Sequence, residues 1–489
     1  MLLVGLALLA GLLYPLAFSP YDFWPALLVS IAAGYACLSR VRTGCGAFAV
    51  GWAYGFGVFA FGISWVHVSM HDYGYMPMWM AVPATGGFAA FLALFVGLVF
   101  WGSARLGKSP WVFASLWLLV DWVRGWFLTG FPWLYAGYAF VDTPLVRLAP
   151  FGGVWLLTIM AVLVATAPMA WLARRHWQNI LPAAVVAGLV ILSLILPDSL
   201  FTRPSGPMQN VALAQGNIPQ DIKWQLDMRE RTRQIYVELT ERVPDDTLVI
   251  WPESAITEFY QDAEHWLSYQ GLRLESRGGA FISGIPWRRA TTDGALYHNS
   301  IAVIGDSTQV YHKQKLVPFG EYVPLQSLLR GLIPFFDLPM YGFTRGEPDQ
   351  SNLQALGQTL SPFICYEILY PALVAERSKE SDVLITVSND AWFGTSAGPL
   401  QHLQMARLRA AETGRWLLRG TNNGVTAIID HRGQITAQLP QFERDVLMGR
   451  YQPRQGTTPF MVLGIWPWLL LSSLCIACAL RKAYRRNSA

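Results

Sequence analysis

Three residues with complementary chemistry each follow a short apolar run in the middle of the chain. Cys365 ends Pro-Phe-Ile-Cys, Glu253 follows Leu-Val-Ile-Trp-Pro, and Lys313 follows Val-Tyr-His. A carboxylate can take the proton of a thiol, and an ammonium can stabilise first the thiolate and then the oxyanion that forms at an attacked carbonyl. Together these residue types predict acyl transfer through a thioester on Cys365.

Each of these residues also has an ordinary explanation when it is taken alone. Cys365 could be a small core residue, Glu253 a helix cap or surface acid, and Lys313 a solvated residue at a strand end. However, Cys365 has no other cysteine between residues 203 and 455 with which to form a disulfide, although we place this region on the oxidising side of a membrane. The set of three, more than any single member, therefore favours Cys365 as the nucleophile. The remaining cysteines lie in or beside apolar segments: Cys37, Cys45, Cys475 and Cys478.

The region that carries these residues alternates β-rich runs with amphipathic helical stretches, which predicts a layered α/β domain. Ligands bind at the carboxyl ends of strands in open α/β sheets, so residues that follow strands are well placed for catalysis. We expect strands at 211–214, 247–251, 280–285, 300–304, 309–312, 361–365, 383–388, 426–429 and 446–451. We expect helices at 227–242 and 402–413.

The rest of the chain has the composition of a membrane protein. The 489 residues are 53% hydrophobic and only 14% charged, whereas soluble proteins carry about 25% charged residues. A span needs about 20 apolar residues. We expect eight spans, at about 2–18, 24–39, 46–68, 77–101, 110–128, 151–173, 179–197 and 458–480. The predicted organisation is a seven-span bundle over 1–200, a water-exposed catalytic domain over 203–455, a C-terminal span over 458–480 and a basic tail over 481–489.

The basic residues near the span ends predict the orientation of the chain. They cluster after every second span, and such clusters remain in the cytoplasm. Both termini are then cytoplasmic, and the catalytic domain lies on the opposite side. Within the fifth span, Asp121 and Arg124 are three residues apart and share one helical face, so we expect them to pair inside the bundle, with a role in holding a lipid head group as the alternative. The clusters are Arg40 and Arg42, Arg105 and Lys108, Arg174 and Arg175, and Arg481, Lys482, Arg485 and Arg486.

Several classes of function find no support in the sequence. No Cys/His cluster has metal-ligand spacing, and neither a Gly-x-Gly-x-x-Gly motif nor a P-loop is present. The net charge of +4 is small for the length, and no long run of like charges suggests a polyanion partner. We therefore expect no metal, no cofactor and no nucleic-acid partner.

The three motifs together resemble the nitrilase superfamily, whose members use a Glu–Lys–Cys triad on an α-β-β-α sandwich. Two further segments, Leu316-Val-Pro-Phe-Gly-Glu321 and Ser388-Asn-Asp-Ala-Trp-Phe-Gly394, make the chain similar to the apolipoprotein N-acyltransferase family. The resemblance implies that Glu253 is the general base, Lys313 rather than Lys315 the oxyanion stabiliser, and Cys365 the nucleophile. It also implies that supporting residues surround the triad: Glu321, Tyr366, Glu367 and Trp224.

The resemblance further implies a reaction, its partners and a location. An acyl chain would pass from the sn-1 position of a phospholipid such as phosphatidylethanolamine to Cys365. It would then pass to the free amine of S-diacylglyceryl-cysteine at the N-terminus of an apolipoprotein, which gives a triacylated lipoprotein by ping-pong transfer. The location would be the bacterial inner membrane, with the catalytic domain in the periplasm. We expect the apolar segment 332–343 to dip toward the membrane and gate acyl entry, with ordinary packing over the sheet as the alternative.

Two other functions remain open at this point. A membrane-anchored nitrilase-type amidohydrolase would use the same triad with water as the acceptor. A transporter or receptor would use the outer domain only for binding, but its spans should then carry several ionisable residues or broken half-helices. Asp121 and Arg124 are nearly alone inside the expected spans, which disfavours the second alternative.

Overall fold

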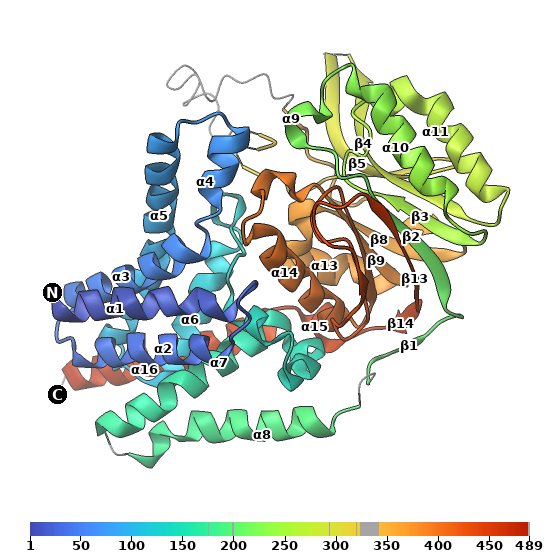
Figure 1. Cartoon of the computed structure of the whole chain (residues 1–489). Helices are drawn as coiled ribbons and strands as arrows, with labels where there is room; N and C mark the ends of the chain where they lie inside the picture. Colours follow the sequence, from blue (N-terminus) through green and yellow to red (C-terminus); the bar gives the residue numbers. More distant parts are fainter. Residues whose placement is uncertain (175, 198–199, 293, 319, 323–341, 488–489) are drawn as a thin grey trace.

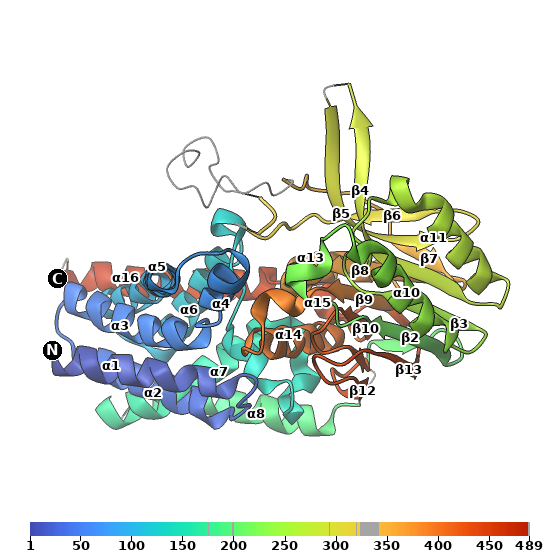
Figure 2. The same cartoon turned by 45° about the horizontal axis from the view of Figure 1, so that its top comes forward.

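The computed structural model describes residues 1–489 except 175, 198–199, 293, 319, 323–341 and 488–489. A bundle of apolar helices occupies one side of the molecule, and a layered α/β domain occupies the other (Figure 1). The two chain ends lie close together at the end of the bundle that is remote from the α/β domain, as both views show (Figures 1 and 2). The segment 332–343, which we expected to gate acyl entry, lies outside the described residues except for its last two.

The bundle is built from helices at both ends of the chain. Its helices are α1 (Leu2–Leu13), α2 (Pro25–Arg40), α3 (Gly44–Gly62), α4 (Val66–Val68), α5 (Met78–Arg105), α6 (Pro110–Arg124), α7 (Ala149–Arg174), α8 (Leu181–Ile195), α15 (Pro459–Leu463) and α16 (Trp466–Asn487). Small residues allow the first and third helices to touch, because a Cβ atom on Gly57 would lie 2.4 Å from the carbonyl oxygen of Leu8. Large apolar side chains are exposed along the outer faces of three helices: Leu94, Leu98 and Trp101 on α5, Ile191, Leu194 and Ile195 on α8, and Leu470, Leu471 and Leu474 on α16.

We expected eight membrane spans. By length and apolar composition alone, fewer helices than this could cross a membrane. Among the described residues three satisfy both: Gly44–Gly62, Met78–Arg105 and Pro144–Ala173. Shorter apolar helices cover Leu2–Ala17, Pro25–Arg40 and Leu181–Ile195. The span expected at 110–128 is a 15-residue helix, α6, that ends at Arg124.

The pairing expected inside the bundle is confirmed. Arg124 donates to Asp121 at 2.8 Å, and both side chains are buried. The same guanidinium donates to the carbonyl oxygens of Phe131 at 2.7 Å and Trp133 at 2.8 Å. This buried ion pair therefore also fixes the loop that follows α6, and that loop reaches the α/β domain.

Two six-stranded sheets form the centre of the α/β domain. The first has the order β13-β2-β3-β4-β5-β6, and the second has the order β12-β11-β10-β9-β8-β7. The strands of the first are β2 (Gln209–Gln215), β3 (Thr247–Trp251), β4 (Ala280–Thr291), β5 (Gly294–Ile304), β6 (Gln309–His312) and β13 (Asp445–Tyr451). Those of the second are β7 (Leu353–Ala355), β8 (Gln358–Ile364), β9 (Val383–Ser388), β10 (Trp416–Thr421), β11 (Ala427–Ile429) and β12 (Ile435–Gln438). A separate pair, β1 (Thr202–Pro204) and β14 (Arg454–Gly456), joins the domain to the bundle.

The alternation of side chains along each strand produces the layers. In β3, Leu248 and Ile250 belong to the core between the two sheets, whereas Val249 and Trp251 pack under the outer helices. The helices on this side are α9 (Gln220–Lys223), α10 (Met228–Glu241) and α11 (Tyr260–Glu275). Those on the outer face of the second sheet are α13 (Pro371–Arg377) and α14 (Gly398–Thr413). The result is an α-β-β-α sandwich, the layered α/β arrangement that the family resemblance implied.

Helix α14 belongs to the sandwich and to the bundle at the same time. One continuous apolar core includes residues of the second sheet, of α14 and of the bundle. Gln401 on α14 accepts hydrogen bonds from Trp65 at 3.2 Å and Trp133 at 2.6 Å, and both donors come from the bundle. The second sheet is therefore packed, through α14, against the membrane part of the molecule.

Several strand predictions agree with the structure, both for the fully buried β3 and β9 and for the mostly half-buried β6. The bounds of β3, β6 and β9 agree with the expected ranges 247–251, 309–312 and 383–388. The strand expected at 361–365 ends at Ile364, so Cys365 lies in the turn that follows it. The sequence analysis missed β10 and α11.

Candidate active site

The fold brings the three predicted residues to one place from two sheets. Glu253 follows β3 and Lys313 follows β6, both in the first sheet, whereas Cys365 follows β8 in the second. Lys313 Nζ lies 3.6 Å from Glu253 Oε1, and these side chains are only 1% and 10% exposed. Charge interactions of both Glu253 and Lys313 reach the Cys365 thiol. The base, the cation and the thiol therefore share one buried site.

Two further residues complete the charged part of the site. Glu321 Oε1 accepts from Lys313 Nζ at 2.8 Å, and its other carboxylate oxygen accepts from the backbone N–H of Val317 at 2.8 Å. Asn299 on β5 donates to Glu253 at 2.7 Å and to Glu321 at 2.9 Å. One ammonium and one amide thus hold two carboxylates apart in fixed positions. The supporting position that the resemblance gave to Glu321 agrees with this geometry.

Cys365 occupies a turn with an unusual backbone. Its φ is +50°, in the left-handed region, and a short 3₁₀ helix runs from Cys365 to Leu369. A non-glycine residue in this conformation costs roughly 1–2 kcal/mol, so surrounding contacts must maintain it. A sharp strand-to-helix turn of this kind raises the nucleophile above the end of its strand.

Glu367 connects the Cys365 turn, through hydrogen bonds, to the loop that carries Lys313. One carboxylate oxygen accepts from the backbone N–H of Ile364 at 2.9 Å, immediately before the nucleophile. The other accepts from the phenol of Tyr311 at 2.9 Å and from the backbone N–H groups of Gln314 and Lys315 at 2.6 and 3.1 Å. Glu367 is fully buried and connects the Lys313 segment of the first sheet with the Cys365 segment of the second.

The electrostatics of the site favour a protonated thiol and a charged lysine. Burial raises the pKa of Cys365, and the negative charge of Glu253 raises it further, while Lys313 acts in the opposite direction. Burial disfavours the Lys313 ammonium, but Glu321 and Glu253 outweigh this effect and hold its pKa above the usual range. If Cys365 attacks a carbonyl, a neighbouring group would therefore have to take its proton, and the Glu253 carboxylate and the Lys313 ammonium both lie at this site.

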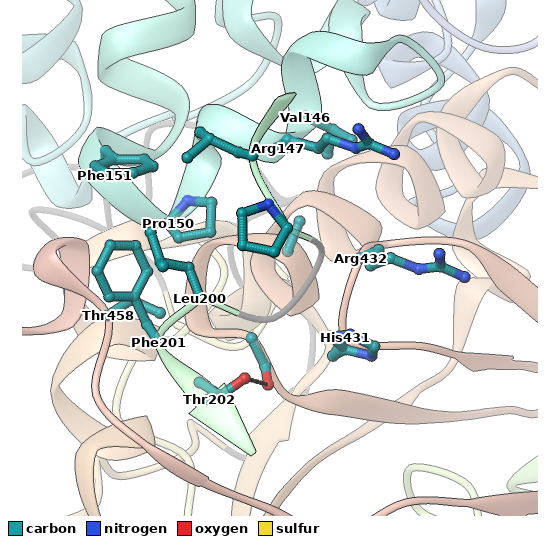
Figure 3. Close-up of a pocket in the computed structure, with 14 residues that line it drawn as sticks. Val146, Arg147, Pro150, Phe151, Leu200, Phe201, Thr202, His431, Arg432 and Thr458 are labelled. Atoms are coloured by element: carbon teal, nitrogen blue, oxygen red, sulfur yellow. Dashed lines mark hydrogen bonds between the residues drawn. The ribbon is translucent and has the colours of Figure 1, made fainter. Parts of the chain in front are cut away.

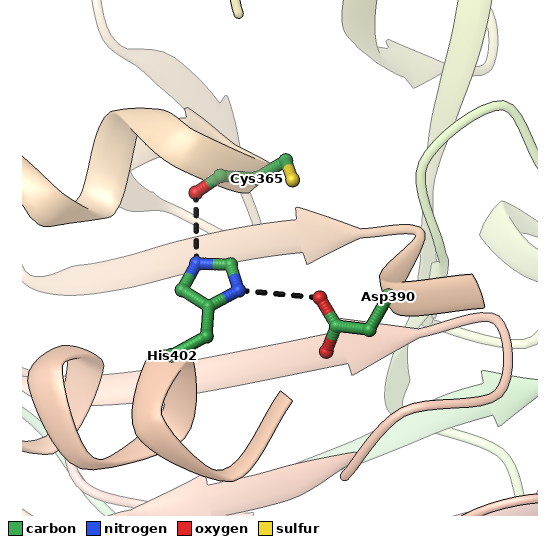
Figure 4. Close-up of side chains that lie close together, drawn as sticks. All are labelled: Cys365, Asp390 and His402. Atoms are coloured by element: carbon green, nitrogen blue, oxygen red, sulfur yellow. Dashed lines mark hydrogen bonds and ion pairs between the residues drawn. The ribbon is translucent and has the colours of Figure 1, made fainter. Parts of the chain in front are cut away.

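A second polar cluster lies beneath the nucleophile turn (Figure 4). Among the described residues, Cys365, Asp390 and His402 could offer three metal ligands within 4.8 Å of one another. Both carboxylate oxygens of Asp390 are already engaged, one by Ser388 at 2.6 Å and the other by Arg419 at 2.6 Å. Because the guanidinium would repel a cation, this arrangement does not suit a metal ion.

Tyr366 and Trp224, the other predicted residues, lie at different places around the site. The Tyr366 phenol is buried and donates to the carbonyl oxygen of Gly130 at 3.0 Å, in the loop that Arg124 fixes. Trp224 follows α9 and is 48% exposed, so it is not a core residue. The sequence alone leaves two explanations for Trp224, a substrate contact and an anchoring role in the core or in a loop, and its exposure excludes the core.

Several residues of the site were missed by the sequence analysis. Asn299 lies in the middle of a β-strand and no local pattern marks it. Asn389, whose backbone N–H donates to Glu253 Oε2 at 2.8 Å, belongs to the Ser-Asn-Asp segment that was noted only as a pattern. Lys223 is fully buried and donates to the Glu253 carbonyl oxygen at 3.3 Å. Burial lowers the pKa of Lys223 to about 8.

A separate cavity lies at the junction between the bundle and the sandwich (Figure 3). It is lined by residues around the start of α7, the connection after α8, the end of α14 and the β11–β12 connection, among them Arg147, Phe151, Phe201, His431 and Arg432. None of the catalytic candidates lines it, so it is distinct from the site around Cys365.

Comparison with known proteins assigns both parts of the chain. Residues 10–167 match the family model of the apolipoprotein N-acyltransferase N-terminal domain, and residues 210–457 match that of carbon-nitrogen hydrolases. An apolipoprotein N-acyltransferase from Pseudomonas syringae pv. tomato is 47% identical to the chain, over 98% of this chain and 96% of its own length. The chain belongs to the apolipoprotein N-acyltransferase family.

Other apolipoprotein N-acyltransferases match over similar lengths. One from Pseudomonas aeruginosa is 45% identical over 97% of this chain and 95% of its own. One from Vibrio vulnificus is 39% identical over 99% of this chain and 97% of its own. The similarity to the apolipoprotein N-acyltransferase family therefore spans the bundle and the sandwich together.

Proposed function

We propose that this protein transfers an acyl chain from a membrane phospholipid to the N-terminal amine of an S-diacylglyceryl-cysteine apolipoprotein, through a thioester on Cys365. The observation that carries the proposal is the convergence of Glu253, Lys313 and Cys365 in one buried site that is packed directly on an apolar helical bundle. Both proposed substrates are lipids, and a site joined to a membrane-embedded bundle can receive them without extracting them into water. Membership of the family agrees with this reaction.

In the first half-reaction the Cys365 sulfur attacks the ester carbonyl of the phospholipid. Glu253 takes the thiol proton as the carbon–sulfur bond forms, and the negative charge on the carbonyl oxygen develops near the Lys313 ammonium. The ester carbon–oxygen bond then breaks, and the proton held by Glu253 passes to the leaving alkoxide. The products of this step are a lysophospholipid and the Cys365 thioester.

In the second half-reaction the lipoprotein amine attacks the thioester carbonyl. Glu253 accepts a proton from the attacking nitrogen, and Lys313 again faces the oxyanion. The carbon–sulfur bond breaks, and the proton returns from Glu253 to the Cys365 sulfur. The site is thereby restored, and an amide has formed on the apolipoprotein. Glu321 and Asn299 hold the Glu253 carboxylate and the Lys313 ammonium in position throughout the cycle.

We further propose that the chain crosses the bacterial inner membrane eight times. The seven-span part covers 1–200, the catalytic domain 203–455 lies in the periplasm, and the last span at 458–480 leads to a basic cytoplasmic tail at 481–489. Support comes from the position of both termini at the end of the bundle remote from the sandwich (Figure 1) and from the lipid-compatible outer faces of α5, α8 and α16. A reporter active only in the cytosol, fused near Gly206, should be silent, and activity of that fusion would contradict the orientation.

Mass spectrometry on the purified protein tests the reaction. After incubation with phosphatidylethanolamine vesicles, the peptide that contains Cys365 should gain the mass of one acyl chain. Addition of a diacylglyceryl lipopeptide should move this mass to the peptide amine. A matched lipopeptide with an acetylated amine should leave the thioester in place.

Two outcomes would contradict the proposed function. A Cys365→Ala variant that still produced acylated lipopeptide would exclude the thioester route. Release of free fatty acid at the same rate with and without the lipopeptide would instead indicate a hydrolase that uses water as the acceptor.

A further inference from the structure

The backbone carbonyl of Cys365 contacts His402, a residue to which neither the sequence motifs nor the proposed reaction gives a role. The ring nitrogen Nε2 of His402 lies 3.1 Å from the carbonyl oxygen of Cys365 (Figure 4). This carbonyl belongs to the residue whose φ of +50° lies in the left-handed region. His402 comes from α14, the helix shared by the sandwich and the bundle, so the contact bridges the nucleophile turn and the helix beneath it.

The chemistry of the neighbours determines which His402 nitrogen carries the proton. A carbonyl oxygen only accepts, so the contact with Cys365 requires a hydrogen on Nε2. In the neutral ring Nδ1 must then accept, and Arg419 lies 3.3 Å from it as a donor. Asp390 Oδ1, 3.2 Å from the same Nδ1, already receives the hydroxyl of Ser388. The neutral Nε2–H form therefore matches the Cys365 carbonyl oxygen as acceptor and Arg419 as donor.

Burial and charge support the same form. His402 is 1% exposed, and Asp390 and Arg419 are 4% exposed or less. Burial lowers the pKa of His402 and the Arg419 guanidinium lowers it further, against the opposing effect of Asp390. The groups that face the ring are the Cys365 carbonyl from the turn, Asp390 after β9, Arg419 from β10 and the indole of Trp133 from the bundle.

We infer that His402 is a positioning residue: as an Nε2–H donor oriented by Arg419, it holds the Cys365 carbonyl and so keeps the nucleophile turn in its left-handed conformation. The direction of the Cys365 side chain follows from that backbone conformation. Without the donor the turn is free to relax toward an ordinary φ, which would move the sulfur away from Glu253 and Lys313. A displacement of about 1 Å at a reacting atom can cost about 10²-fold in rate. The inference rests on the proposed role of Cys365 and explains how its geometry is maintained.

Three variants separate positioning from a purely structural role. His402→Gln retains an N–H donor, His402→Leu removes it, and Gln404→Leu removes a buried polar group of the same helix that bonds to Ser19 and Asp22 of the bundle instead. The measurement is the single-turnover rate of Cys365 acylation from phosphatidylethanolamine vesicles, with the thermal unfolding midpoint and the phospholipid KM of each variant. We expect His402→Leu to lower the rate by about 10²-fold at unchanged KM, and His402→Gln to restore most of it. Gln404→Leu should lower the unfolding midpoint but leave the rate unchanged.

A leucine variant with the wild-type rate, or a glutamine variant as slow as the leucine variant, would overturn the inference. If the leucine variant does not fold, the tautomer of the wild-type protein decides. In a ¹⁵N spectrum of histidine-labelled protein, with the His402 signal assigned by its loss in His402→Gln, we expect the neutral Nε2–H form around neutral pH. The Nδ1–H form would overturn the inference, because its Nε2 cannot donate. Failure of the wild-type protein to form the thioester would contradict the proposed function and leave the tautomer as a separate test.

Discussion

The two sheets contribute to the site in different ways. The first sheet carries charge: Glu253, Lys313 and Lys223 are all buried on its side, with Glu321 beside them. The second sheet carries Cys365, the proposed nucleophile, whose pKa is raised by burial. Glu367 accepts from the backbone N–H of Ile364 immediately before it, and His402 contacts the carbonyl oxygen of Cys365 itself. The charges of the first sheet neutralise one another, whereas the geometry of the second depends on neighbours in both the other sheet and the bundle.

This difference predicts that substitutions in the two sheets will affect the reaction rate and the stability differently. Loss of Glu253 or Lys313 should lower the rate far more than the stability, because we propose that these two groups act on the reacting atoms. Loss of a contact in the second sheet should lower stability and rate together, because the turn around Cys365 is strained and is maintained from outside. The variants below test this distinction, beginning with the largest expected effect.

Glu253→Gln removes the base of the first sheet. Its amide cannot take the thiol proton, so we expect the acylation rate of Cys365 to fall by about 10²–10⁴-fold, as measured by single-turnover mass spectrometry. The matched control is Glu258→Gln, a nearby acid that pairs with Arg233 at 2.7 Å, and its rate should equal that of the wild type. A Glu253→Gln variant with the wild-type rate would contradict the proposed role of Glu253 as the base.

Lys313→Met removes the cation between the two carboxylates. We expect a loss of about 10²–10³-fold in the acylation rate, because the oxyanion loses its partner. The control is Lys315→Met, two residues away, where the side chain is exposed and lies over the ring of Tyr370. Equal losses in the two variants would contradict the assignment of the catalytic lysine to Lys313.

The titration of Lys223 should make the free energy of unfolding depend on pH. Burial lowers its pKa from the usual 10.5 to about 8. Between these values the unfolded chain binds more protons than the folded one, so the free energy of unfolding rises with pH by up to about 3 kcal/mol. Lys223→Met should remove this rise in denaturant titrations at successive pH values. A variant with an unchanged pH slope would show that Lys223 does not titrate in this way.

Tyr366→Phe tests the link between the nucleophile turn and the bundle. It removes one hydrogen bond to the Gly130 carbonyl and should lower the free energy of unfolding by about 1 kcal/mol. The acylation rate should fall with it, by less than about tenfold. Tyr269→Phe, on the exposed surface of α11, should change neither quantity. A fall in rate without a fall in stability would place the Tyr366 phenol in the chemistry instead of the scaffold.

The sequence predicted the regular parts of the fold and the residues at strand ends. Glu253 and Lys313 could be predicted from the sequence because buried strands have a recognisable composition and the residue after such a strand lies at a defined edge of a sheet. β10 was missed because Arg419 and Gly420 interrupt its apolar run, although the strand is almost entirely buried. The buried Arg419 guanidinium is compensated there by Asp390, 29 positions earlier, which accepts from it at 2.6 Å.

The sequence by itself determined the kinds of chemical group in the site, a layered α/β domain and the apolar bundle, since these follow from composition and local periodicity, whereas the α-β-β-α order of the layers was implied by the family resemblance. Only the tertiary structure decided that Asn299 spaces two carboxylates, that Glu367 ties the two sheets together and that His402 supports the backbone of Cys365. These contacts join residues that are distant in sequence, and each depends on directions that side chains acquire only after the sheets and α14 have packed. The reason is physical: a buried polar group needs a partner, but no local pattern states which distant residue will provide it.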